Sequence, residues 1–141
     1  MQSVDDIYTK LYDIRVAGVK THEKYPPYTF NTASYPLLFF RNIKLNLQYS
    51  ASLEYSLAGG IPSTLDLSTG SAEMIVIVES FRQGTSVQNY AKSREIINAI
   101  ADAVNASNIT IDVDGVEIEE DFELTGDTVL FVVKCKINFM V

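Results

Sequence analysis

The chain has 141 residues, of which 47% are hydrophobic, and it carries a formal net charge of −7 and a single cysteine. This length favours one domain spanning 1–141, and the apolar content is sufficient for a packed core. The negative charge disfavours binding to nucleic-acid phosphate, the lack of a long apolar run disfavours a transmembrane helix, and one cysteine excludes an internal disulfide.

The N-terminal segment predicts a helix from Ser3 to about Val16, because apolar residues such as Ile7 and Leu11 recur at helical spacing. Gly18 is placed to end this helix. The acidic start lacks the basic and apolar pattern of a signal peptide. We therefore expect the protein to be made and used in a cytosol.

The next stretch, 20–35, is irregular, since Pro26 and Pro27 break regular structure. It predicts an extended segment that is laid over a surface. His22 lies here and is the only histidine of the chain, which excludes a metal site built on several histidines of one chain. We expect His22 to be exposed to solvent. A short buried strand is predicted at 36–40.

Residues 43–57 alternate between apolar and polar without a break, which is a strong strand signal. At roughly 3.3 Å per residue this strand would measure about 50 Å. A domain of this size has a diameter of only about 37 Å. We therefore expect that the strand either bends sharply or leaves the domain, and that in the second case a partner covers its apolar stripe.

Turn-forming residues at 58–63 and a second strong strand at 72–79 complete a long hairpin over about 43–80, with its tip near 58–64. The centre of the second strand, 74–78, is apolar at every position, so both of its faces are expected to be covered. The apolar residues toward the tip are predicted to form an interface with another subunit. These residues are Tyr49, Ala51, Leu53, Tyr55, Leu57, Ile61, Leu65 and Leu67.

The second half of the chain predicts a helix at about 87–103 and a strand meander at about 108–141, with turns at 114–115 and 125–127. Cys135 alternates with apolar neighbours, which indicates a small buried hydrophobe. The predicted fold class is α+β, a mainly antiparallel sheet with a long protruding β-hairpin and two helices packed on the sheet.

The meander contains an acid-rich segment with Asp112, Asp114, Glu117, Glu119 and Asp121. The segment lacks the spacing of a calcium loop. One interpretation is a solvated strand face. A second is a negative surface formed by Glu117, Glu119 and Asp121, which would repel passing DNA. A third, of a different class, is a small ligand- or metal-binding module that uses Asp112, Asp114 and Glu117.

No constellation of reactive side chains is evident, so we expect no enzyme, no cofactor and no metal site. The run VIVESFRQGTSVQNYAKSREIINAIADAV, residues 76–104, resembles the strand–loop–helix of tail terminator proteins of long-tailed bacteriophages. The loop 81–91 carries most of the resemblance, and the upstream segment 19–40 also fits. The chain resembles phage neck and tail-completion proteins almost as closely.

The resemblance implies a homohexameric ring on the head-proximal end of the tail tube, which stops tube growth and offers a joining surface to the head–tail connector or neck protein. It implies a virion protein that is assembled in the bacterial host cytoplasm, with no membrane partner and with DNA only as passing cargo. The long hairpin would be the assembly arm, and Glu117, Glu119 and Asp121 would line the lumen.

Overall fold

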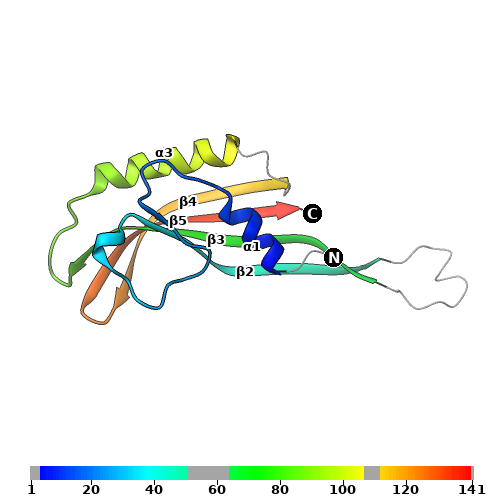
Figure 1. The fold of residues 1–141 in the computed structure, drawn as a ribbon, viewed down its shortest axis with the longest axis horizontal. Helices are drawn as coiled ribbons and strands as arrows, with labels where there is room; N and C mark the ends of the chain where they lie inside the picture. Colours follow the sequence, from blue (N-terminus) through cyan, green and yellow to red (C-terminus); the bar gives the residue numbers. More distant parts are fainter. Residues whose placement is uncertain (1–3, 51–63, 107–111, 141) are drawn as a thin grey trace, which may run out of the picture.

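The computed structural model describes residues 4–50, 64–106 and 112–140; for 4, 48–50, 64–68, 112 and 114 it describes the backbone alone. The described elements form the predicted α+β fold, with two α-helices and a five-stranded sheet (Figure 1). In chain order they are α1 (Val4–Tyr12), β1 (Thr21–His22), the 3-10 turn η1 (Thr32–Ser34), β2 (Leu37–Ser50), β3 (Thr64–Arg82), α3 (Tyr90–Ala106), β4 (Asp112–Thr125) and β5 (Thr128–Met140).

The strand order in the sheet is β1-β2-β3-β5-β4. The short strand β1 runs parallel to β2, and the other three pairings are antiparallel. The sheet therefore has β3 and β5 at its centre and β4 at one outer edge. The opposite edge is formed by β1 and by the part of β2 that β1 does not cover.

Both helices pack on the same face of the sheet, which we call the helix face. Ile7 and Leu11 of α1 and Ile96 and Ile100 of α3 meet the inward residues of the strands in one core. Along β5 that core takes alternate residues, as expected for a strand with one face on the core. These residues are Phe131, Val133, Cys135, Ile137 and Phe139. Burial raises the pKa of Cys135 to about 12, so this thiol is the inert hydrophobe that was predicted.

The opposite face, which we call the open face, carries a second and smaller apolar cluster. Its members are Leu37, Phe39, Ile75, Ile77, Leu130 and Val132. Tyr35 packs against this cluster, and the ring of Phe30 lies 6.1 Å from that of Phe39. Phe30 and Tyr35 of the irregular segment thus lie over this face, whereas Tyr25 meets Tyr8 of α1 at 4.7 Å. Both faces of the centre of β3 are covered, as predicted.

The first helix ends earlier than predicted, at Tyr12 instead of about Val16. Ile14 and Val16 are still buried in the core, but the chain around them is not helical. The N–H of Val16 donates to Nε2 of His22 at 3.2 Å. That bond replaces the helical bond to the carbonyl of Tyr12, so the imidazole satisfies a backbone N–H that the end of the helix leaves free.

Two predictions about strands are wrong. The predicted turn at 114–115 lies inside β4, which pairs with β5 on both sides of a bulge between Val113 and Gly115. The strands predicted separately from Pro36 and from Ile43 are one strand, β2, with a register shift between Arg41 and Lys44. Asn42 sits in this bulge with a φ of 54°, a conformation that asparagine tolerates better than most residues. The turn at 125–127 is confirmed.

Gly70 marks a close approach between β3 and its neighbours. A Cβ at this position would lie 2.6 Å from the ring of Phe139 and 2.7 Å from the backbone oxygen of Lys44. We predict that Gly70→Ala lowers the free energy of unfolding by about 2 kcal/mol, because the backbone of β2 must move. Gly115→Ala is the matched control, since its Cβ would meet nothing within 4 Å. Urea unfolding of both variants measures the difference, and equal midpoints would contradict the prediction.

Candidate functional site

The predicted hairpin is present in its described part as β2 and β3. The two strands pair as far as Ser50 with Thr64, whereas the last pair between β3 and β5 is Thr69 with Met140. The hairpin therefore continues past the end of β5, as Figure 1 shows. Leu47, in this extension, is 40% exposed.

Of the predicted interface residues, the backbone pairing brings three into this extension. Tyr49 pairs with Leu65, and Leu67 pairs with Leu47. The remaining residues of the predicted interface and most of the predicted tip lie outside the described residues. These are Ala51, Leu53, Tyr55, Leu57 and Ile61. The protruding tip of the arm therefore stays a prediction.

The predicted acidic residues lie on the open face of β4, next to basic residues of β5. The register places Glu117 opposite Lys136 and Glu119 opposite Lys134. Lys134 contacts Asp121 at 2.9 Å. This hydrogen bond, and then that from the backbone N–H of Phe122, lower the pKa of Asp121. The segment is therefore part of a mixed-charge surface: Asp121 is paired, whereas Glu117 and Glu119 are exposed.

Arg41 ties this surface together across the sheet. Its Nε donates to Oε1 of Glu73 at 3.0 Å, and its Nη1 donates to Oε2 of Glu123 at 3.1 Å. A second contact joins Nη2 to Glu123, which makes the pair bidentate. Two strands, β3 and β5, separate Arg41 on β2 from Glu123 on β4. The sheet must therefore curl toward the open face. We call these three residues the Arg41 clamp.

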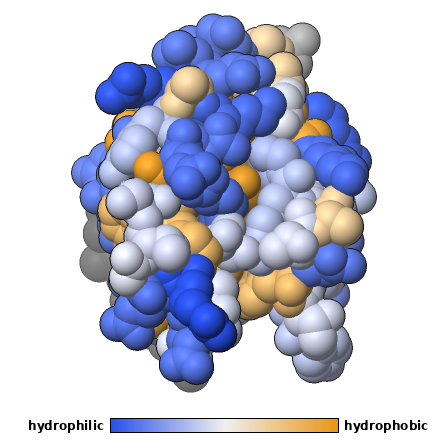
Figure 2. All heavy atoms as spheres, turned by 90° about the vertical axis from the view of Figure 1, so that its left-hand side faces the viewer, coloured by the Kyte–Doolittle hydropathy of each residue, from blue (hydrophilic) through white to orange (hydrophobic). Residues whose placement is uncertain are grey.

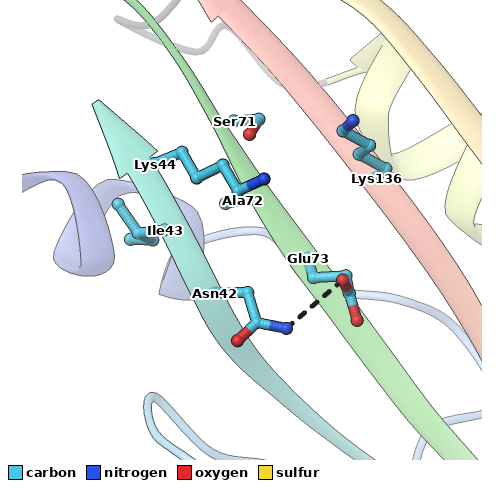
Figure 3. A pocket seen from close by; sticks show the side chains of 7 residues that line it. All are labelled: Asn42, Ile43, Lys44, Ser71, Ala72, Glu73 and Lys136. Atoms are coloured by element: carbon cyan, nitrogen blue, oxygen red, sulfur yellow. Dashed lines mark hydrogen bonds between the residues drawn. The ribbon is translucent and has the colours of Figure 1, made fainter. Parts of the chain in front are cut away.

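A shallow hollow opens beside the clamp, at the bulge of β2 (Figure 3). Its volume is about 380 Å³, and it is lined by Asn42, Ile43, Lys44, Ser71, Ala72, Glu73 and Lys136. Asn42 donates to Oε2 of Glu73 at 3.4 Å across the hollow. The lining offers two ammonium groups and one carboxylate but no histidine or cysteine. It therefore supplies charge and hydrogen bonds without a nucleophile paired with a base.

Among the described residues, no group of three or more His, Cys, Asp or Glu residues is placed to hold a metal ion. The side chains of Asp112 and Asp114, which the third interpretation of the acidic segment requires, are outside the description. None of the described helices has the length and apolar character needed to cross a membrane.

An aromatic cluster that the sequence analysis missed lies at the start of α3. The ring of Phe122 stacks on Phe131 at 5.1 Å, and Tyr90 meets Phe131 edge-on at 5.2 Å. Phe122 and Leu124 are nevertheless 47% and 68% exposed. Figure 2 looks onto this end of the molecule, where apolar residues surface in separate patches among hydrophilic ones. The signal in the sequence was that Ile118, Phe122 and Leu124 occupy even positions of one strand and therefore share a face.

His22 is not the exposed side chain that was predicted. It is half-buried, its Nε2 accepts the N–H of Val16, and its carbonyl oxygen accepts the hydroxyl of Tyr12 at 3.4 Å. Burial, and then the charge of Arg15, lower the pKa of His22 below 6.5. His22 therefore holds the segment after α1 against β1 while its imidazole is neutral.

This arrangement predicts a pH-dependent stability. The unfolded chain binds a proton at His22 near its ordinary pKa, and the folded chain binds it only at lower pH. The contribution of His22 is therefore complete above about pH 6.5 and is lost as the pH falls through the lowered folded pKa. His22→Gln keeps an acceptor for Val16 without titrating. Urea unfolding at neutral and mildly acidic pH should show a larger acid loss in the wild type than in this variant; equal losses would refute the role.

A comparison with models of known protein families finds no match to this chain, and a comparison with curated proteins finds none either. The interpretation of the two surfaces therefore depends on the residues and geometry of the chain itself. The described residues offer a hairpin whose strands pair beyond the last pair of β3 with β5, and a face of paired charges.

Proposed function

We propose that this protein is a structural subunit of the phage tail terminator type: it forms a ring that caps the head-proximal end of a tail tube, stops tube polymerisation and presents a joining surface to the head–tail connector. The observation that carries the proposal is the pairing of β2 with β3 past the last partner in β5. A two-stranded ribbon is at best marginally stable in water by itself. A neighbouring subunit can supply the missing cover.

The charge distribution supports the same role. The chain has a net charge of −7, and Glu117 and Glu119 are exposed on the open face. Although Lys134 and Lys136 lie on the same face, a lumen wall of a chain with this net negative charge would retain DNA poorly, because the excess negative charge repels phosphate. The proposed partners are thus further copies of the chain, the tail tube protein and the connector, with DNA as passing cargo.

The proposal predicts a closed oligomer in solution. Mass photometry of the full chain at micromolar concentration should show a species near six times the chain mass of 15.7 kDa. Added to polymerising tail tubes, this species should cap one end and shorten the tubes, as seen by electron microscopy. A strict monomer that does not bind tubes would overturn the proposal. A ring that binds the connector but not the tube would instead assign it to the neck.

The competing class, a small metal- or ligand-binding module, receives less support. Of the residues that this module would use, Glu117 lies opposite Lys136, and the side chains of Asp112 and Asp114 lie outside the described residues. Calorimetric titration with calcium, magnesium and manganese separates the two classes. We expect no stoichiometric heat; tight binding of one ion per chain would favour the module.

A further inference from the structure

The two outer edges of the described sheet lack a partner strand over most of their length. No described strand pairs with the outer edge of β4. On the other side, β1 covers β2 only at Leu37 and Leu38. Unpaired N–H and C=O groups along an edge are a template for another strand, so proteins either protect such edges or use them.

The two edges carry opposite charges. Every charged residue of β2 is a base, namely Arg41 and Lys44. Every charged residue of β4 is an acid: Asp112, Asp114, Glu117, Glu119, Glu120, Asp121 and Glu123. Arg41 is engaged in the clamp, but neither Lys44 nor Glu119 has an ion pair within the described part of the chain. Both side chains are exposed.

The edges also match face by face. Lys44 lies on the open face of β2, between Ile43 and Leu45, which pack on the helix-face core (Figure 3). Glu119 lies on the open face of β4, next to Ile118, which packs on the same core. A sheet that continues from β4 to a second β2 would place base beside acid on the open face. On the helix face it would bring Ile118, with the exposed Glu120 two residues further along the strand, beside Ile43 and Leu45.

The strand directions allow this continuation. Since the three pairings that connect β2 to β4 are all antiparallel, the two outer strands run in opposite directions. A copy that is rotated about an axis along the strands presents its β2 antiparallel to β4, with its helices on the same side. Such a head-to-tail contact repeats from subunit to subunit and closes a ring when the rotation fits.

We propose that the β4 edge of one copy binds the uncovered β2 edge of a second copy, with Lys44 against the acidic face around Glu119. This inference rests on the proposed function and names the contact by which its ring is built. Symmetric contacts are disfavoured, because β4 against β4 sets acid against acid and β2 against β2 sets base against base.

Charge reversal in the full chain tests the contact. Lys44→Glu and Glu119→Lys should each lower the association constant about tenfold at low salt, as measured by analytical ultracentrifugation. Combined in one chain, the two changes restore opposite charges across the contact and should recover association. Raising the salt from about 50 mM to about 500 mM should weaken the wild type more than either single variant.

Arg94→Glu and Asp102→Lys are the matched controls, because both are exposed on α3 and make the same two changes in net charge. Thermal melting should show that all variants fold, since neither Lys44 nor Glu119 has a partner to lose in the described chain. If the wild type assembles but the single reversals assemble equally well, this contact is refuted and the ring remains. If the wild type is a monomer at every salt concentration, the proposed function fails as well.

Discussion

Replacing Arg41 with methionine is expected to lower the free energy of unfolding by about 2–3 kcal/mol. Methionine keeps much of the aliphatic volume but removes the guanidinium that bonds Glu73 and Glu123. The two carboxylates are only about one-quarter exposed, so they would retain their charge without a counter-ion in a partly desolvated place. The contact between β2 and β4 that keeps the sheet curled over the open-face cluster would then be lost. Urea unfolding at neutral pH measures the loss.

The control for this prediction is Lys44→Met, which removes an exposed base from the same strand and should change stability by less than about 0.5 kcal/mol. A double-mutant cycle with Glu123→Gln isolates the bidentate pair. Arg41→Met should cost clearly less in the Glu123→Gln background, because one of the two carboxylates no longer needs a counter-charge. Wild-type stability of Arg41→Met, or strict additivity in the cycle, would show that the clamp does not hold the sheet.

The sequence was sufficient to predict the elements whose burial is periodic. Strand β5 buries every second residue from Phe131 to Phe139 on the helix face, and this alternation is visible in the sequence. The centre of β3 is apolar at each position, and the structure covers both of its faces. Such patterns are predictive because only one period places all of the apolar residues on covered surfaces.

The sequence also contains a sign of most strand irregularities, namely a change in the spacing of the residues that face the helices. At three of the four register shifts in the described strands, two successive helix-face residues are three positions apart instead of two, which requires one extra residue in the strand. The pairs are Phe40 and Ile43, Val78 and Phe81, and Val113 and Val116. This spacing explains why the predicted turn at 114–115 was wrong: the turn-like residues occupy a bulge in a continuous strand.

The site itself was much less predictable. Arg41 and Glu123 are 82 positions apart and meet across two intervening strands. Their contact depends on how far the sheet curls, which no local pattern reports. The role of His22 likewise depends on the N–H of Val16, which is free only because α1 stops early. Periodicity predicts which face a residue occupies but not which distant polar group it meets there.

Deleting residues 52–66 is expected to abolish ring formation while leaving a folded domain. The deletion joins Ala51 to Leu67, and Leu67 already pairs with Leu47. Residues 48–51 would then form a four-residue connection, a length that hairpins commonly use. The pairing of β3 with β5 begins at Thr69 and is untouched. Circular dichroism and urea unfolding should therefore show a native-like domain, and mass photometry should show the loss of the ring.

Single substitutions distinguish the contribution of the arm's apolar surface to assembly from the contribution of its length. Leu47→Ser removes a half-exposed leucine from the hairpin extension and should weaken assembly, whereas Tyr28→Ser removes a fully exposed aromatic ring elsewhere and should not. If the shortened chain unfolds, the hairpin belongs to the core of its own domain and the length argument is wrong. If it folds and still closes a ring, the β2 and β4 edges are sufficient for assembly. The extension of β2 and β3 would then need a partner other than the chain itself, and the tail tube is the first one to test.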